Sequence, residues 1–287
     1  MSKKEDRHVW ELAKARVIVS NGKVIAVETE PLIKYCPLHE RMLGTTYHTK
    51  ETVKKHLENK IRSISRLCTP NRILVSKVFG VGLGASETFT TALQNRLIDC
   101  MIEPCDGAGT VITDNPEIVQ GIGIAMNALI STTPIPEVIS RLKELGATVL
   151  DPENATIDQI AGLEKAFQLG YKKVGVTIPA AMAKDIEKIR DLEKKYDTKA
   201  IVCGMHSTGI TEDIVPYILQ LDFAQTCSSK VMREIVAKKA RKVYGKVIPV
   251  LAFSKIGQQL LDYREKESKK SPSALIVGEI KPPQPFI

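Results

Sequence analysis

The sequence predicts an α/β fold: a mostly parallel sheet with helices on both faces, preceded by a small α+β N-terminal module with a β-hairpin. From residue 73 onward, short apolar strands alternate with helices of 10–15 residues, a pattern typical of parallel sheets. The strands AIVCG (200–204) and VIPVLAF (247–253) are apolar throughout, which indicates burial on both faces. Before residue 73 the pattern differs and contains a strong hairpin signal.

The N-terminal module is predicted to span residues 1–72. Two β-branched runs within residues 15–28 flank Asn21-Gly22, a dipeptide that favours a hairpin turn. Thr49 can cap a helix that stops before the CTP sequence at 68–70. The apolar positions of that helix follow helical spacing and are Val53, Leu57, Ile61, Ile64 and Leu67.

The α/β domain is predicted to span residues 73–263. Its strands are expected at 73–80, 100–104, 147–152, 173–178, 200–205, 223–227 and 247–253. Its helices are expected at 86–98, 116–130, 136–145, 157–169, 181–196, 212–220, 229–243 and 255–265. The third segment, 264–287, begins with REKESKKSP, which is typical of a flexible linker. ALIVGEI (274–280) would then add a late edge strand, which PPQPF cannot continue.

Composition indicates a globular protein of the cytoplasm. The 287 residues are 43% hydrophobic and 26% charged, and no apolar run approaches the ~18 residues of a membrane span. The start, MSKKEDRHVW, is charged and lacks the apolar core of a secretory signal. We therefore expect no membrane association and reduced thiols. The six cysteines are then free, ligating or catalytic, rather than a disulfide framework.

The net charge of +8 raises the question of a nucleic-acid partner. Aromatic residues make up only 5% of the chain, and the Lys-Lys pairs mostly lie beside acids in helical patterns. A solvated basic surface explains this better than a nucleic-acid site, which would combine basic and aromatic side chains. We expect no nucleic-acid partner, while an acidic protein partner stays open.

Functional residues are expected at one edge of the predicted sheet. In open parallel α/β sheets, ligands bind outside the carboxyl ends of the strands. The residues that follow the predicted strands are 105–110, 151–153, Thr177, 206–209, 227–229 and Ser254. This placement says where to look, and it leaves the chemistry open.

One hypothesis for this edge is an anionic small-molecule site in an enzyme or sensor. Glycines at 107 and 109 in CDGAGT permit positive φ or close approach of a ligand to the backbone. The candidate ligand-binding residues are Gly107, Gly109, Thr110, Ser207 and Thr208. His206 is the candidate acid or base, with Asp106 or Asp151 as its partner. VGLGASE (81–87), which opens a helix, is either a second anion site or a tight turn capped by Ser86.

A competing hypothesis uses the cysteines. Cys36, Cys68 and Cys105 lie beside Pro or Gly, so they are expected on loops, where three thiolates could hold a [4Fe–4S] cluster with one iron open. Cys227 or His206 would be the fourth ligand. A third possibility is a zinc site that uses the C-x-x-H pair Cys36 and His39.

The remaining cysteines and histidines are assigned no role. Cys100 and Cys203 lie inside apolar strands and are expected in the core. His8, His48 and His56 lie in charged segments and are expected at the surface.

At the level of motifs, the chain resembles the methanogenesis marker protein 8 family, from about residue 10 to 262. The stretches that carry the resemblance are YCPL (35–38), LCTP (67–70), VGLGASE (81–87), CDGAGTVITDNPEIVQGIG (105–123), the long segment 132–160, HSTG (206–209) and CSSK (227–230). VGLGASE departs from the more aromatic VGFGASE form expected in the family, and we attach no consequence to that.

The resemblance implies an archaeal, cytoplasmic accessory protein of methane metabolism. It implies a role in maturing or activating methyl-coenzyme M reductase, with a protein partner in the machinery that matures that enzyme. Combined with the cluster hypothesis drawn from the cysteines, this gives an iron–sulfur-binding assembly or activation factor. It supplies no established activity and no catalytic residues.

Overall fold

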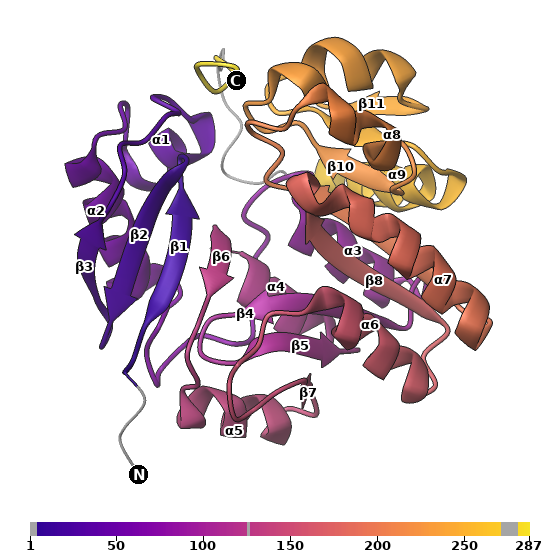
Figure 1. Ribbon diagram of the computed structural model, residues 1–287, viewed down its shortest axis with the longest axis horizontal. Coiled ribbons are helices and arrows are strands. Elements are labelled where there is room, and N and C mark those ends of the chain that lie inside the picture. The colour runs from indigo at the N-terminus through magenta and orange to yellow at the C-terminus, as the bar shows by residue number, and fades with distance from the viewer. Residues whose placement is uncertain (1–4, 125–126, 271–280) are drawn as a thin grey trace.

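The fold consists of two sheets that lie next to each other in the molecule (Figure 1). The computed structural model describes residues 5–124, 127–270 and 281–287. A four-stranded antiparallel sheet has the order β3-β2-β1-β6, and an eight-stranded sheet has the order β11-β12-β10-β9-β8-β4-β5-β7. The expectation of an α/β fold with an N-terminal hairpin module is confirmed.

The small sheet is built from β1 (His8–Leu12), β2 (Ala15–Ser20), β3 (Lys23–Val27) and β6 (Ala128–Ser131). The predicted hairpin is β2–β3, with positive φ at Asn21 and Gly22. The strand β1 was not predicted, because its turn to β2 uses Ala13 and Lys14 at positive φ and has no glycine to signal it. β6 lies in a segment expected to be helical, and it pairs with β1 across the boundary predicted at residue 72.

Two helices and a π-helical turn cover the small sheet. They are α1 (Pro37–Leu43), α2 (Lys50–Asn59) and the π turn Lys60–Ile64. Thr49 caps α2 as predicted, since its side chain accepts a hydrogen bond from the Thr52 amide. Trp10, Leu57 and Leu67 are fully buried in the core between these helices and the sheet.

The large sheet has a parallel centre and antiparallel edges. Its strands are β4 (Cys100–Cys105), β5 (Gly109–Thr113), β7 (Thr148–Val149), β8 (Lys173–Pro179), β9 (Lys199–Met205), β10 (Phe223–Gln225), β11 (Lys242–Tyr244) and β12 (Val250–Ala252). β4, β8, β9 and β10 are parallel, whereas β5 and β12 run antiparallel to their inner neighbours. β12 was predicted in the parallel series, but the unpredicted strand β11 and a turn at Gly245 reverse the chain before it.

Helices cover both faces of the large sheet, as expected. They are α3 (Ala85–Gln94), α4 (Pro116–Gly123), α5 (Pro136–Glu144), α6 (Gln159–Gln168), α7 (Ile186–Tyr196), α8 (Val215–Ile218) and α9 (Lys255–Lys270). Short helical turns are Ala180–Asp185, Glu212–Ile214, Met232–Val236 and Ala237–Lys239. On one face, α3 and α9 pack through Phe89 and Leu260; on the other, Leu163 and Ile189 of α6 and α7 meet the sheet.

Two predicted segments differ from the structure. Residues 73–80 were expected to be a strand, but they form an extended connection outside both sheets, with Val78 exposed. Residues 264–270 were expected to begin a linker, but they continue α9, because Arg264 is buried and donates to the Gly82 carbonyl oxygen at 2.6 Å. The edge strand predicted at 274–280 lies outside the described residues.

The domain boundaries at 72 and 263 stay predictions. Within the described ranges, no helix is both long enough and apolar enough to cross a membrane.

Candidate functional site

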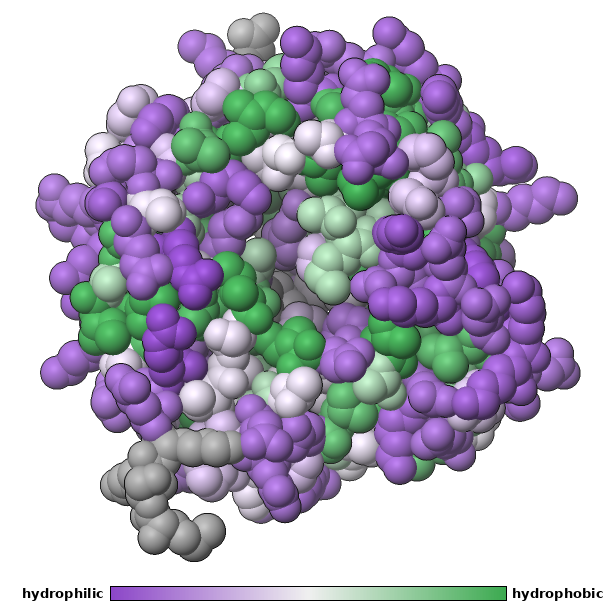
Figure 2. Space-filling view, viewed as in Figure 1, coloured by the Kyte–Doolittle hydropathy of each residue, from purple (hydrophilic) through white to green (hydrophobic). Residues whose placement is uncertain are grey.

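A cavity of about 360 Å³ lies between the N-terminal module and the carboxyl ends of the central parallel strands. Figure 2 shows the surface hollowed between these two parts of the molecule. The strand ends contribute Glu103 of β4, Pro179 of β8 and Met205 of β9, and the N-terminal module contributes Cys36 and Lys60. The expected location of the functional face is therefore where this cavity opens, and the volume suits a small organic molecule.

Several of the residues that follow the predicted strands line the cavity. Thr177, His206, Thr208, Cys227 and Ser228 are among its lining residues. His206 and Cys227 both have positive φ, at 52° and 43°, in the turns that leave β9 and β10. Because these turns are irregular, they direct side chains toward the cavity rather than along the sheet.

The cavity wall formed by the N-terminal module contains a chain of histidines. His48 Nδ1 lies 2.8 Å from the Ile33 carbonyl oxygen, and His48 Nε2 lies 2.9 Å from His39 Nδ1. A carbonyl can only accept, so His48 carries its proton on Nδ1. Burial lowers the pKa of both imidazoles, which keeps them neutral. His39 therefore donates from Nδ1 and keeps a bare lone pair on Nε2, and the residue lines the cavity.

Lys60 lies beside this chain, at the start of the π-helical turn. Its side chain is 2% exposed, and Nζ donates to Asn127 Oδ1 at 2.5 Å. Burial lowers the pKa of Lys60 to about 7, while the Cys36 thiol opposes the shift. The Lys60 charge in turn helps to lower the pKa values of His39 and His56, which places these side chains close together. A large fraction of Lys60 is thus a neutral amine at neutral pH.

Glu103 marks another part of the cavity wall. Its side chain is 5% exposed, and Oε1 has no hydrogen-bond partner within the described residues. Burial raises the pKa of Glu103 well above its usual value, so the folded protein favours the neutral carboxylic acid. A protonated, unpartnered acid in a cavity wall is a ready hydrogen-bond donor to a ligand.

The VGLGASE loop leads into α3 next to Glu103. Glu87 Oε1 accepts from the amides of Gly80 and Val81 at 3.0 and 3.2 Å, and Ser86 Oγ donates to its other oxygen. A Cβ on Gly84 would lie 1.9 Å from the Glu87 carboxylate. The amides considered for an anion site therefore bind the Glu87 carboxylate of the same loop. The close approach of this carboxylate explains why residue 84 is a glycine.

The four cysteines considered for a cluster lie in three places. Cys36 and Cys227 both line the cavity, and the charge of Cys227 contributes to the raised pKa of Cys36. Burial raises the pKa of both thiols, and nearby backbone amides pull each value back. Cys68 is buried in the core of the N-terminal module, where its sulfur accepts from the Trp10 indole at 3.3 Å. Cys105 is fully buried in a different apolar cluster.

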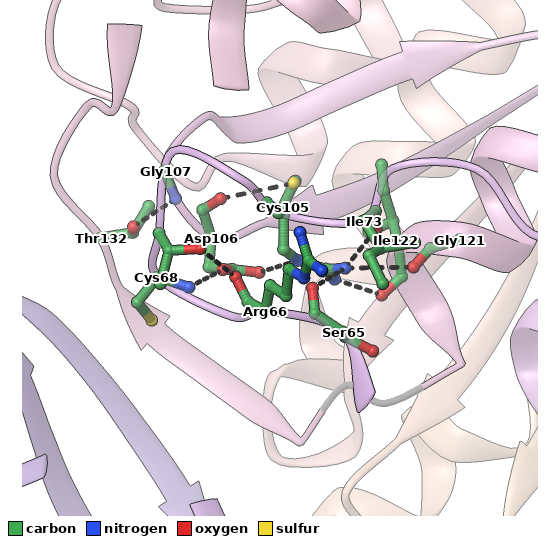
Figure 3. Close-up of polar contacts among 12 residues, drawn as sticks. Ser65, Arg66, Cys68, Ile73, Cys105, Asp106, Gly107, Gly121, Ile122 and Thr132 are labelled. Atoms are coloured by element: carbon green, nitrogen blue, oxygen red, sulfur yellow. Dashed lines mark hydrogen bonds and ion pairs between the residues drawn. The ribbon is translucent and has the colours of Figure 1, made fainter. Parts of the chain in front are cut away.

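Asp106, a candidate acid–base partner, lies in a buried polar network that joins the two parts of the molecule (Figure 3). It accepts from Arg72 Nε at 2.9 Å and from the Cys68 amide. The Arg72 guanidinium also donates to the carbonyl oxygens of Ser65, Ile73, Gly121 and Ile122. Both members of the ion pair are fully buried, so Asp106 has a structural partner instead of His206.

The CDGAGT loop is a buried hairpin turn between β4 and β5. The Gly107 amide donates to Thr132 Oγ1 at 2.8 Å, and the Thr110 amide donates to the Thr156 carbonyl oxygen at 3.0 Å. A Cβ on Gly109 would lie 2.3 Å from the Ala155 backbone. The two glycines do adopt positive φ as expected, but for turn geometry and close packing, and the loop amides are used within the protein.

The other strand-end candidates serve local structure. Ser207 Oγ donates to the Gln225 carbonyl oxygen at 2.7 Å, and Thr208 Oγ1 accepts from the Ser228 amide. Asp151 forms a turn with Asn154. Ser254 was expected at the functional edge; because β12 is antiparallel, it lies at the other edge and donates to Asp222.

The fit of these residues to a metal centre is poor. In the part of the chain that the structure describes, no group of three or more His, Cys, Asp or Glu side chains is arranged to hold a metal ion. Cys68 and Cys105 are buried among apolar side chains and the Arg72–Asp106 pair, away from the cavity that Cys36 and Cys227 line. We therefore derive no chemistry through a cluster or a zinc ion.

Several site residues were missed in the sequence. His8, His48 and His56 were expected at the surface, but all three are at most 2% exposed. His56 and Lys60 flank the apolar stripe of α2 at helical spacing, and this was the available signal. Nothing local marked Glu103, which lies within the apolar strand β4.

Comparison with known proteins places the chain in a family. Residues 8–266 match a family described as an uncharacterized protein conserved in archaea, DUF2099. The chain belongs to this family. It is also 40% identical over 268 residues to "Uncharacterized protein MJ0054" of Methanocaldococcus jannaschii, which covers 92% of each chain. These descriptions support an archaeal family of unknown function, and they do not contain the methanogenesis-marker name.

Proposed function

We propose that this DUF2099 protein is a small-molecule enzyme or sensor, whose ligand lies in the cavity between the N-terminal module and the strand ends. One observation carries the proposal: the Glu103 side chain lines this cavity, and its buried Oε1 has no hydrogen-bond partner in the described residues. Burying a polar group without a partner costs free energy, typically ~1–3 kcal/mol. A bound ligand would recover that cost.

The polar groups of the cavity favour a ligand rich in acceptor oxygens. Protonated Glu103 donates from one part of the wall, and Lys60 and the β9–β10 turns supply further donors. Thiols of Cys36 and Cys227 and apolar residues such as Met205 complete the lining. An oxo acid or a small carboxylic acid matches this pattern better than an amine does.

The test measures binding of a panel of small compounds to the full chain purified without oxygen. Saturation-transfer NMR and thermal unfolding would compare glyoxylate, pyruvate, succinate and inorganic phosphate with ethylamine and glucose. A ligand at 100 times its Kd stabilises the protein by ~2.7 kcal/mol. We expect binding by the oxygen-rich acids, and a panel in which nothing binds would contradict the proposal.

A matched pair of variants locates the site. Ala128 of β6 lines the cavity, whereas Ser131 of the same strand is exposed and is not among the lining residues. Ala128→Trp should fill the cavity and abolish binding, and Ser131→Trp should leave binding unchanged. Equal binding by both variants would place the ligand elsewhere.

The resemblance to methanogenesis marker protein 8 carries a further part of this proposal, an accessory role in methane metabolism. The activation of methyl-coenzyme M reductase, an iron–sulfur cluster and a protein partner stay predictions of that resemblance. Iron and sulfide content of the protein purified without oxygen tests the cluster.

A further inference from the structure

Lys60 combines burial with a place in the cavity lining. Its side chain is almost fully buried, yet it lines the cavity, and Nζ donates to the neutral amide oxygen of Asn127. Hydrogen bonding to Asn127 fixes the direction of the amine. A π-helical turn begins at Lys60, and such turns are frequent at functional sites.

The groups around Lys60 can carry protons. Those that affect its charge or are affected by it are Cys36 before α1, His39 on α1 and His56 on α2. The hydrogen bonds from Ile33 through His48 leave Nε2 of His39 unprotonated. His39 and Lys60 line the same cavity, so a base and an amine are available to one ligand, and a second imidazole orients the base.

We infer that Lys60 forms an imine with an aldehyde or ketone carbonyl of the cavity ligand, with His39 Nε2 relaying the proton. This inference rests on the proposed function, and it narrows the ligand to a carbonyl compound. The neutral amine attacks the carbonyl carbon and the C–N bond forms. His39 Nε2 accepts the first proton that nitrogen loses and delivers it to the carbonyl oxygen, which gives a carbinolamine. His39 then accepts the second amine proton and delivers it to the hydroxyl group. Water leaves as the C=N bond forms, so both amine hydrogens depart with the carbonyl oxygen.

The test traps the imine on the full chain with glyoxylate and sodium cyanoborohydride at pH 7. Hydride reduction of the C=N bond leaves a carboxymethyl group on the lysine, which peptide mass spectrometry locates. Lys55, exposed on α2 and paired with Glu51 at 2.6 Å, is the internal control. A lysine with a pKa near 7 has a neutral fraction ~10³-fold above that of an ordinary one, so we expect at least ~100-fold faster labelling of Lys60.

Variants separate the role of Lys60 from that of His39. Lys60→Arg should remove the labelled peptide, and Lys55→Arg should leave Lys60 labelling unchanged. His39→Gln should slow labelling by ~100-fold and flatten its pH dependence, while Lys60 stays labelled on longer incubation. Unchanged labelling kinetics in His39→Gln would overturn the proton-relay role.

The outcome also distinguishes this inference from the proposed function. If glyoxylate binds in the NMR assay and Ala128→Trp prevents binding, but Lys60 is labelled no faster than Lys55, the imine is refuted and the cavity site stands. If glyoxylate neither binds nor labels Lys60 while the other acids bind, the imine is again refuted. If no compound of the panel binds or labels, both proposals fail.

Discussion

Replacement of Lys60 by methionine should stabilise this protein at neutral pH, although it removes a buried hydrogen bond. Burial lowers the pKa of Lys60 from its usual 10.5 to about 7, so the folded state disfavours the charged amine. Each pKa unit corresponds to ~1.36 kcal/mol, and the cost at pH 7 is therefore ~4 kcal/mol as an upper estimate. Leaving the Asn127 oxygen unpaired costs ~1–2 kcal/mol. The net gain for Lys60→Met is ~2 kcal/mol.

The pH dependence of this gain gives the sharper measurement. Between pH 7 and 10.5 the unfolded chain binds a proton at Lys60 that the folded chain largely lacks, so wild-type stability rises with pH in this window. Lys60→Met has no such titration. Its advantage over the wild type should therefore shrink by ~3 kcal/mol from pH 7 to pH 10, because by then the unfolded lysine is also losing its proton.

Urea denaturation of both proteins at pH 7 and pH 10 measures this double difference. The cost of the lost hydrogen bond is the same at both pH values and drops out of the comparison. Lys55→Met, on the exposed side of the same helix, should follow the wild-type pH profile. A stability difference between Lys60→Met and the wild type that does not change with pH would refute the assignment of a neutral, buried amine.

Three further perturbations test other parts of the structure. Asp106→Asn leaves the fully buried Arg72 guanidinium without its counter-ion and should destabilise the protein by ~3–5 kcal/mol in urea denaturation; an unchanged free energy of unfolding would contradict the closed ion pair. Glu103→Gln should be more stable than the wild type by ~1 kcal/mol or more at pH 7, but not at pH 4. The raised pKa of Glu103 means that, at pH 7, the unfolded chain loses a proton that the folded chain keeps, and this lowers the stability of the wild type. An equal effect of the substitution at both pH values would contradict a protonated Glu103. Gly109→Ala should lower the free energy of unfolding by ~2 kcal/mol more than Gly146→Ala does. Both glycines have positive φ, but only at Gly109 would an added Cβ have backbone atoms within 4 Å. Equal melting temperatures of the two variants would disprove the close packing.

Much of the fold could be predicted because its signals are local. The strands β4, β8 and β9 read as apolar runs, and the α2 cap and the β2–β3 turn each depend on neighbouring residues. Strand direction is different, because it depends on which strand a segment pairs with. Because the sequence does not show which strand β12 pairs with, β12 was predicted to be parallel. Ser254, which follows β12, was therefore placed at the wrong end of the sheet.

The location of the cavity could be predicted from the sequence, but the full set of residues that line it could not. The rule that ligands bind at the carboxyl ends of parallel strands located the cavity, together with His206 and Cys227. It could not distinguish a lining residue from a buried turn such as Gly107. That distinction rests on which amides already have partners, and Thr132, the partner of Gly107, lies 25 residues away in sequence.

By itself, the sequence determined the α/β class and the alternation of elements, and it predicted the strand ends at which the cavity lies. Only the tertiary structure decided that Cys68 and Cys105 belong to the interior and that Lys60, His39 and Glu103 face one cavity. The physical reason is desolvation, which is set by every segment that packs around a group. It turns Lys60 into an amine and Glu103 into a neutral acid, and no local pattern of residues records it.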